Sequence, residues 1–328
     1  MRGEIIASIL SSHDAVFIDT RYIFKSFNRL IQSLGFRYKI GPLVKRVNGL
    51  VRREIGKSEF YDMIWVDKAI YLHPSTTKIL RNKTKCLIHY TPDTAFFANK
   101  SRYFNRSMGI YSYLVTTKSY DLPFYRENVP DKYLILTTQG FDPRYHRSSY
   151  TFEEKEVDVA FIGLYEPHRE KVLQLILDNG FTLVLAGHGW DRFAVKNRAN
   201  ESFKFAGRSI QKEAYGKLIS SARFSPGLLS KKFPEKHTTR TFEIPACGTA
   251  LLTEYNEETS TFYAENEAIF YNDEKEMIRK MIYYRDHADK LKILTVAGMQ
   301  RITENGPDYP SVLFSVLHST SVLRPELI

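Results

Sequence analysis

Short apolar runs that alternate with helical segments are the feature that most constrains how this chain of 328 residues can fold. In the first half, helical spacing of apolar residues occurs at residues 22–34, 74–81 and 118–127. The apolar runs lie at residues 15–19, 61–66, 85–90, 110–116 and 133–136. Strands buried on both faces of a parallel sheet are continuous apolar runs, and helices connect them. The first half is therefore predicted to be an α/β domain, with Gly35 ending its first helix.

A second series of the same kind follows the polar segment 147–156, which has the composition of a linker. Its apolar runs lie at residues 157–162, 181–186, 202–206, 249–253 and 268–271. Helical segments lie at residues 167–177, 212–222, 274–284 and 289–304. We expect an α/β fold with two Rossmann-like domains facing a central cleft, residues 1–150 and 151–305. The tail, residues 306–328, is expected to carry a helix that returns to the first domain.

Composition narrows the class of protein. The chain is 43% hydrophobic, so it can bury two cores. Its two cysteines, Cys86 and Cys247, lie in apolar surroundings and form no metal-binding or disulfide pattern, which suits a reducing cytoplasm. No apolar run approaches the roughly 20 residues that span a membrane. A cytoplasmic protein is expected.

Positive charge is concentrated in the first half of the chain. Residues 1–150 carry 24 Lys and Arg against 12 Asp and Glu, whereas the remainder carries 23 against 25. A basic half implies an anionic partner. The alternative is a basic surface that is merely solvated. The most basic window, residues 37–57, also has apolar residues at helical spacing. It predicts an amphipathic helix that either docks on the inner face of an anionic membrane or packs with a solvated charged face.

The stretch at residues 235–254, EKHTTRTFEIPACGTALLTE, has the order expected at a nucleotide-binding corner. A polar and basic loop leads into a short helix that contains Arg240 and Glu243, and Gly248 precedes an apolar run. In open parallel sheets, ligands bind at the carboxyl ends of strands, where helix N-termini attract phosphate. The stretch therefore predicts a nucleotide site in the second half.

On these residues the second half resembles the C-terminal domain of GT-B glycosyltransferases, in particular the glycosyl transferases group 1 branch that includes CgeB-like proteins. The motifs that carry the resemblance are RTFEIPACG at 240–248, LLTE at 251–254, EAIFYND at 267–273, AGMQR at 297–301, FAGR at 205–208 and QGFDP at 139–143. It covers about residues 157–305. It implies metal-independent transfer of a sugar from a UDP-, GDP- or dTDP-sugar to a hydroxyl of a cell-envelope glycan, glycolipid or polysaccharide, with no cofactor.

The resemblance also implies roles for two glutamates. Glu243 stands where the family holds the ribose hydroxyls of the donor. Glu235, eight residues earlier, gives the Glu-x7-Glu spacing of retaining members, whose first glutamate faces the donor sugar. The chain departs from the family between them, because residues 236–239 (KHTT) replace an apolar loop that contains glycine.

The chemistry of a nucleotide diphosphate-sugar supports such a site independently. A carboxylate can accept from both ribose hydroxyls, cations can neutralise the departing pyrophosphate, and glycines let the backbone come close to the ligand. The predicted donor-binding residues are Glu243, Arg240, Glu235, Lys236, His237, Gly163, Arg169, Gly207 and Arg208. The alternative for Arg240 and Glu243 is a structural ion pair.

An inverting enzyme also needs a base for the acceptor hydroxyl, and the first domain offers three candidates. Asp93 follows the apolar run at residues 85–90 after a turn fixed by Pro92, so it should lie at the carboxyl end of a strand. His89 is the second candidate, although a histidine inside a strand is more often packed. His13 is the third. The alternative for Asp93 is a helix cap.

Other chemistries lack their motifs. The chain has no GxxxxGK[ST], no GxGxxG after a first strand, no HExxH or cysteine cluster, and no GxSxG. No metal is expected. Two alternatives to a glycosyltransferase stay open: a nucleic-acid-binding or DNA-modifying GT-B protein, suggested by the basic first half, and an inactive GT-B binding scaffold. Nucleic acid is the less favoured partner.

Overall fold

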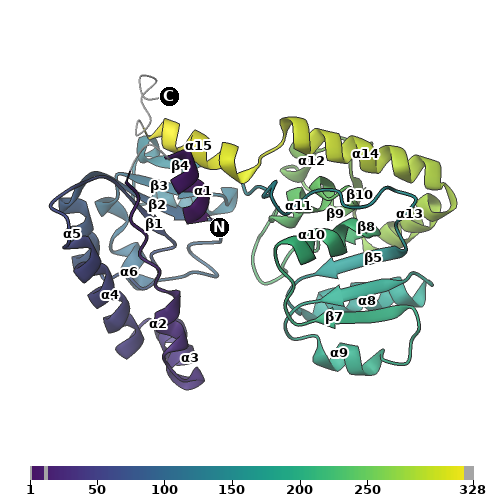
Figure 1. Ribbon diagram of the computed structural model, residues 1–328, viewed down its shortest axis with the longest axis horizontal. Coiled ribbons are helices and arrows are strands. Elements are labelled where there is room, and N and C mark those ends of the chain that lie inside the picture. The colour runs from purple at the N-terminus through teal and green to yellow at the C-terminus, as the bar shows by residue number, and fades with distance from the viewer. Residues whose placement is uncertain (1, 11–13, 321–328) are drawn as a thin grey trace. The chain divides into compact units, whose positions relative to one another are not determined.

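The computed structural model describes residues 2–10 and 14–320, which divide into two compact units (Figure 1). Unit 1 extends to Thr138 and takes up the chain again from Pro310, and unit 2 comprises Gln139–Tyr309. Each unit is built on its own parallel sheet. The predicted α/β fold with two Rossmann-like domains is therefore confirmed, whereas residues 321–328 of the predicted tail lie outside the described residues.

The sheet of unit 1 has four parallel strands in the order β1-β2-β3-β4. These strands are β1 (Tyr61–Asp67), β2 (Thr84–Thr91), β3 (Tyr113–Thr116) and β4 (Leu134–Leu136). Leu87, Leu114 and Leu80 are buried in its core. The helices are α1 (Arg2–Ile9), α2 (Arg21–Lys25), α3 (Arg29–Tyr38), α4 (Pro42–Ile55), α5 (Pro74–Asn82), α6 (Arg102–Asn105), α7 (Leu122–Arg126) and α15 (Tyr309–Ser319), with short 3₁₀ turns at Met108–Ile110, Ser119–Asp121 and Asp131–Tyr133.

Helix α4 shows why the basic window folds as it does. Its first residue is a proline, whose fixed backbone angle φ suits the start of a helix. Its apolar residues, spaced three and four apart, are buried in the core of unit 1: Leu43, Val44, Val47, Leu50, Val51 and Ile55. Of the two readings of this window, the packed helix is the one that the structure supports, because α4 keeps no apolar face for a membrane.

Several boundaries predicted for unit 1 are wrong. The run at residues 15–19 forms no strand, and Val16 and Phe17 are 66% and 58% exposed. The helix predicted at 22–34 is two helices, because Asn28 caps α3 by accepting from the Ile31 N–H, and Gly35 lies inside α3 rather than ending it. The helix predicted at 118–127 is a 3₁₀ turn followed by α7, and the strand predicted at 110–116 starts at Tyr113.

The sheet of unit 2 has six parallel strands in the order β10-β9-β8-β5-β6-β7. Its strands are β5 (Val157–Ile162), β6 (Leu183–Ala186), β7 (Phe203–Gly207), β8 (Ala222–Pro226), β9 (Ala250–Glu254) and β10 (Ile269–Tyr271). The chain moves outward from β5 to β7 and then returns to the other side of β5 with β8. The strand order therefore reverses between β5 and β8, which is where open sheets of this kind bind ligands.

Helices cover both faces of this sheet. Alternate strand residues pack into two clusters: Phe161 and Leu185 with α8, α9, α13 and the start of α14, and Ala160 and Leu251 with α10 and α11. The helices are α8 (Pro167–Asp178), α9 (Asp191–Lys196), α10 (Glu213–Ser220), α11 (Arg240–Ala246), α12 (Thr259–Phe262), α13 (Glu274–Asp286) and α14 (Ala288–Asn305). The sequence patterns had located all of these except the short α9 and α12.

The boundary between the units lies earlier than the sequence suggested. Residues 139–156 belong to unit 2, because Lys155 is buried and donates to the Ala222 carbonyl, and the Ser149 N–H donates to Ser220. Where the chain enters and leaves unit 2, Phe141 pairs with Asp308. Gly140 lies against this second segment, and a Cβ at Gly140 would come within 2.5 Å of the Pro307 carbonyl oxygen. No helix of the described residues has both the length and the apolar composition needed to cross a bilayer.

We expect Gly140→Ala to lower the free energy of unfolding by about 1–3 kcal/mol, because the added methyl group must push the two paired segments apart. Urea unfolding followed by circular dichroism measures this loss. Gly49→Ala is the matched control, since its Cβ would meet nothing within 4 Å and a helix interior favours alanine. Equal stability of the two variants would contradict the argument.

Candidate functional site

The candidate site in unit 2 lies at the carboxyl ends of β5 and β8. Gly163 follows β5, Leu228 follows β8, and Arg240 begins α11. A Cβ on Gly163 would come within 2.8 Å of Phe161 Cζ and 3.1 Å of Arg240 Nη1. The absence of a side chain at Gly163 thus makes room for the Arg240 guanidinium at the end of β5, rather than for a ligand directly.

Two arginines meet on one backbone carbonyl at this edge. Arg169, from α8, donates to the Leu228 oxygen at 3.0 Å and to the Leu164 oxygen at 3.0 Å. Arg240 donates to the same Leu228 oxygen at 3.1 Å, with a longer bond of 3.4 Å to Ile162. Burial, and then the neighbouring charge of Arg240, lower the pKa of Arg169 to about 10. The pair is a concentration of positive charge at the point where the strand order reverses.

The two arginines differ in what they can still bind. Arg169 is 4% exposed, and its bonds tie the loop after β5 to the loop after β8, so it is a positioning residue. Arg240 is partly exposed, and its two carbonyl bonds use two of the five N–H donors of a guanidinium. The Nε–H of each arginine is buried and has no hydrogen-bond partner in the described structure, so this donor does not separate the two. Their exposure does, and Arg240 is therefore the one of the two whose Nη donors an anion can reach.

Two neighbours of Arg169 were not identified from the sequence. Glu166 is buried and lies 3.4 Å from Arg169 Nη2, and it also faces His168 at 3.7 Å. His168 bonds the Leu229 carbonyl through Nε2 at 2.9 Å. Burial outweighs the charge of Glu166 and lowers the pKa of His168, so the ring is favoured as the neutral form. Their positions around Pro167, at the start of α8, were the available signal.

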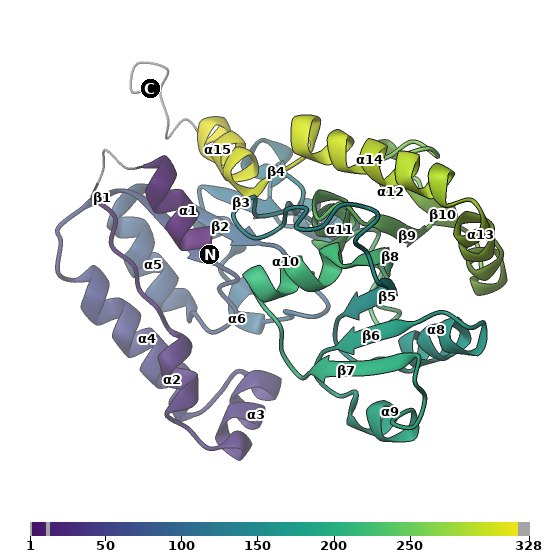
Figure 2. The same cartoon turned by 45° about the vertical axis from the view of Figure 1, so that its right-hand side comes forward.

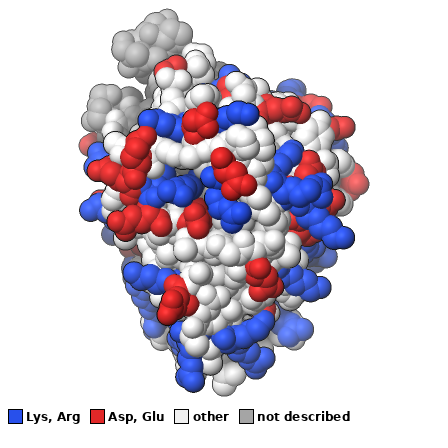
Figure 3. Space-filling model, turned by 90° about the vertical axis from the view of Figure 1, so that its right-hand side faces the viewer, with Lys and Arg blue, Asp and Glu red and all other residues white. Residues whose placement is uncertain are grey.

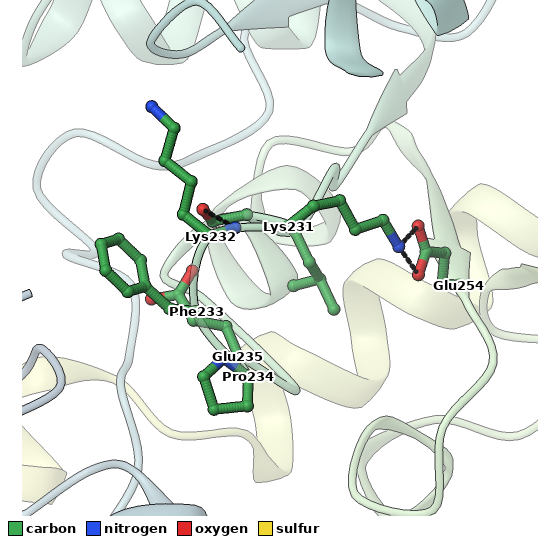
Figure 4. Close-up of a pocket in the computed structure, with 8 residues that line it drawn as sticks. Lys231, Lys232, Phe233, Pro234, Glu235 and Glu254 are labelled. Atoms are coloured by element: carbon green, nitrogen blue, oxygen red, sulfur yellow. Dashed lines mark hydrogen bonds and ion pairs between the residues drawn. The ribbon is translucent and has the colours of Figure 1, made fainter. Parts of the chain in front are cut away.

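A hollow of about 430 Å³ opens beside this edge and is lined by the loop after β8, residues 229–235, and by Glu254 at the end of β9 (Figure 4). Lys231 Nζ lies 2.6 Å from both oxygens of Glu254. Figure 4 shows Lys232 extending from the loop in the opposite direction. Glu235, a predicted donor-binding residue, lines the hollow. The hollow thus carries both signs of charge.

Glu243 lies one helical turn after Arg240 and is held by two residues that the sequence did not point to. Its Oε2 accepts from the Tyr215 hydroxyl at 2.7 Å, and its Oε1 lies 3.8 Å from His146 Nε2. Burial, and then the charge of Glu243, raise the pKa of Tyr215, which keeps its hydroxyl a donor. His146 is oriented by the Asp142 N–H, which donates to its Nδ1 at 2.9 Å. The carboxylate is therefore fixed rather than free, and it forms no ion pair with Arg240 among the interactions described.

Two further predicted donor-binding residues, His237 and Lys236, make contacts that hold the loop before α11. His237 is 3% exposed, pairs with Glu258 through Nδ1, and meets Phe242 and Phe262 edge-on, so the prediction that it faces the donor is wrong. Lys236 fixes the loop through its carbonyl, which accepts from Asn256 and Thr259.

The FAGR block lies at the end of β7. Gly207 has a left-handed φ of +118° with open space around its Cβ position. Arg208 forms a surface ion pair with Asp191 at 2.8 Å. Among the contacts described, neither residue meets Arg169 or Arg240. These two arginines meet at the ends of β5 and β8, and β6 separates β7 from β5.

In unit 1, Asp93 lies just beyond the carboxyl end of β2. Its Oδ2 is 2.5 Å from Lys68 Nζ, and Asn99 donates to it at 3.3 Å. Burial raises the pKa of this carboxyl, but the charge and hydrogen bond of Lys68 outweigh burial, and the net pKa is lowered. Asp93 is thus an ionised, partly exposed carboxylate, and the helix-cap alternative is not what the structure shows.

His89 is excluded as an accessible base. It is fully buried in β2, with its ring stacked on Phe104 at 4.2 Å and edge-on to Tyr111. Burial lowers its pKa to about 4. The prediction of a catalytic role for His89 is therefore wrong, since no acceptor can reach the ring, and His13 lies outside the described residues.

Asp121, which the sequence did not single out, lies near Lys118 in the same unit. It is fully buried, and its Oδ2 accepts from the Ala95 N–H at 2.7 Å. Burial raises its pKa to about 6.

Among the described residues, no group of three or more His, Cys, Asp and Glu could hold a metal ion. The expected independence from metals stays a prediction.

The comparisons with known proteins agree with this architecture. Residues 169–309 match the family model described as "Glycosyl transferase-like". The matched residues lie in unit 2, and the chain as a whole has the GT-B fold. The prediction made from its motifs is thereby confirmed. A search of curated proteins found no match to the sequence.

Several solved structures share the GT-B fold with this chain. The crystal structure of HepE from Anabaena, in complex with UDP and glucose, has a TM-score of 0.66 at 14% identity over 90% of this chain and 84% of that one. A sucrose-phosphate synthase from Thermosynechococcus elongatus gives 0.61 at 9% identity, over 92% and 79%. A TarM mutant from S. aureus, in complex with UDP, gives 0.59 at 11% identity, over 84% and 59%. Similarity at these identities establishes the fold of the GT-B protein.

We expect the buried His89 to make unit 1 less stable in acid. Its pKa is about 4 when folded, against an ordinary value of 6.5, so below pH 6.5 the unfolded chain binds a proton that the folded chain refuses. Stability should fall by up to about 3 kcal/mol as the pH falls from 6.5 to 4. Thermal unfolding at a series of pH values measures it.

His89→Phe should flatten that pH dependence, because a phenyl ring can keep the stacking on Phe104 and does not titrate. The exposed His188, changed to Phe, is the control and should keep the dependence of the unaltered protein. An unchanged acid loss in His89→Phe would assign that loss to other groups.

Proposed function

We propose that this protein transfers a sugar from a nucleoside diphosphate-sugar to a hydroxyl group of a glycan or glycolipid acceptor. The observation that carries the proposal is the Arg169–Arg240 pair on the Leu228 carbonyl, where the strand order of unit 2 reverses. Glu166 already faces Arg169, whereas a diphosphate would supply negative charge to Arg240, and the diphosphate gains more charge as the sugar departs. The complex of HepE with UDP and glucose supports a donor of this class.

Each residue of the site has a chemical task in this proposal. Arg240 binds the diphosphate with its spare N–H donors and stabilises the leaving group. Glu243 accepts from the ribose hydroxyls, because each carboxylate oxygen has a second lone pair beyond its present partner. Glu235, in the hollow, is the candidate to contact the donor sugar.

Asp93 is our proposed base for the acceptor hydroxyl. It is ionised, partly exposed and lies at the carboxyl end of β2, where ligands of open sheets bind. Lys68 holds it in place and keeps it unprotonated. The class of acceptor, a cell-envelope glycan, glycolipid or polysaccharide, is a part of the proposal that rests on the sequence resemblance. The location in the cytoplasm, at or near the inner face of the membrane, rests on the composition of the chain.

We expect isothermal titration calorimetry to detect binding of UDP, GDP or dTDP, and Glu243→Gln to weaken it by about 2 kcal/mol, the scale of a hydrogen bond to a charged group. Glu265→Gln, an exposed glutamate of the same unit, should bind as the unaltered protein does. Unchanged affinity in Glu243→Gln would remove the ribose role. Absence of nucleotide binding together with tight duplex DNA binding at physiological salt would favour the nucleic-acid alternative.

We expect Asp93→Asn to reduce turnover by about 10²–10⁴-fold while nucleotide affinity is kept, because it removes the base but no donor contact. Lys68→Met should move the acid limb of the activity profile to higher pH, since burial, which raises the pKa of Asp93, is then unopposed by Lys68. Activity assays from pH 4 to 8 test both variants. Near-normal turnover of Asp93→Asn would eliminate it as the base.

A further inference from the structure

Helix α3 presents an exposed apolar stripe. Leu30, Leu34 and Tyr38 are 75%, 53% and 52% exposed, and their spacing of four residues places them on one face of the helix. Phe36 and Ile40, nearby in the sequence, are also about half exposed. Large apolar side chains grouped in this way on a helix usually mark an interaction surface.

The stripe is free because α3 is attached to unit 1 by a different strip. Gly35 is buried there, and a Cβ on it would lie 3.4 Å from the Cβ of Leu43, a core residue of α4. Figures 1 and 2 both show α3 beside α2, at the end of unit 1 remote from its four-stranded sheet. Little of the circumference of α3 is therefore used in holding the fold together.

Positive charge surrounds the stripe. Arg29 and Arg37 are exposed on the neighbouring strip of α3, and Lys25 is exposed in α2. Residues 21–57 contain ten Lys and Arg and a single acid, Glu54. By contrast, the side of the molecule in Figure 3 shows both signs of charge intermixed. Apolar and basic side chains grouped together complement a partner that has an apolar interior and an anionic surface.

Helix α4, which the sequence suggested as the membrane contact, is engaged elsewhere. Its apolar residues are in the core. Arg52 donates to Thr76 and Ser75, and Arg53 pairs with Glu54. Helix α3, unlike α4, exposes apolar and basic side chains together.

We propose that α3 docks on the surface of an anionic lipid bilayer. Leu30, Leu34 and Tyr38 enter the boundary between headgroups and acyl chains, while Arg29 and Arg37 contact the lipid phosphates. The helix lies in the plane of the surface and does not cross it. This docking goes beyond the proposed sugar transfer and does not depend on it.

Co-sedimentation with vesicles of phosphatidylcholine and phosphatidylglycerol in equal parts tests the proposal. Leu30→Gln with Leu34→Gln should lower the partition coefficient about tenfold for each leucine. Arg29→Gln with Arg37→Gln should lower it about fivefold for each charge, and added salt should mimic that loss. Ile293→Gln with Val296→Gln, an exposed apolar pair on α14, is the matched control and should bind as the unaltered protein does.

Three results would contradict the proposal. The first is full vesicle binding by the double leucine variant with its circular dichroism unchanged. The second is a dimer of the unaltered protein, seen by light scattering, that the leucine variant dissociates while vesicle binding stays the same, because a second copy would then cover the stripe. Equal binding to pure phosphatidylcholine would likewise refute a role for the basic residues.

Discussion

The carbonyl oxygen of Leu228 is the contact on which the candidate site depends. Arg169 and Arg240 come from helices on either side of the reversal in strand order, and they meet on this oxygen because β5 and β8 are neighbours in the sheet. Two guanidinium groups so close repel each other, and burial together with this repulsion lowers the pKa of Arg169 to about 10, so it keeps its charge at neutral pH. Glu166 lies 3.4 Å from Arg169 Nη2 and offsets the charge of that arginine, so the positive charge left for an anion is that of Arg240, where we propose that the donor diphosphate binds.

Glu243 illustrates a second way in which the fold prepares a group. Tyr215 and His146 hold its carboxylate from two different parts of unit 2, so the group loses little rotational freedom when it binds a ligand. His146 is itself oriented by the backbone of Asp142, in the segment where the chain enters unit 2. The entry segment thereby contributes to the site as well as to the connection.

The sequence predicted what depends on local patterns. Buried strands such as β5 and helix starts such as Pro167 have signals within a few residues, and so does the helix that begins at Arg240. Partners distant in the chain leave no such signal, which is why the Tyr215 hydroxyl on Glu243 and the Leu228 carbonyl between two arginines were not predicted. The strand predicted at residues 15–19 was wrong for the same reason. Its composition favours a strand, but composition does not reveal whether the sheet has a neighbouring position for it.

The contrast between α3 and α4 follows from this distinction. Both helices are amphipathic and basic, so composition alone makes either a candidate for a membrane surface. Burial decides between them, since Leu43 and Val47 complete the core of unit 1 whereas Leu30 and Leu34 face outward. Gly35 is what permits the difference: without a side chain it lets α3 lie against Leu43, and the apolar stripe is left over after the core is full. If the stripe contributed to the stability of unit 1, its side chains would be buried in the core.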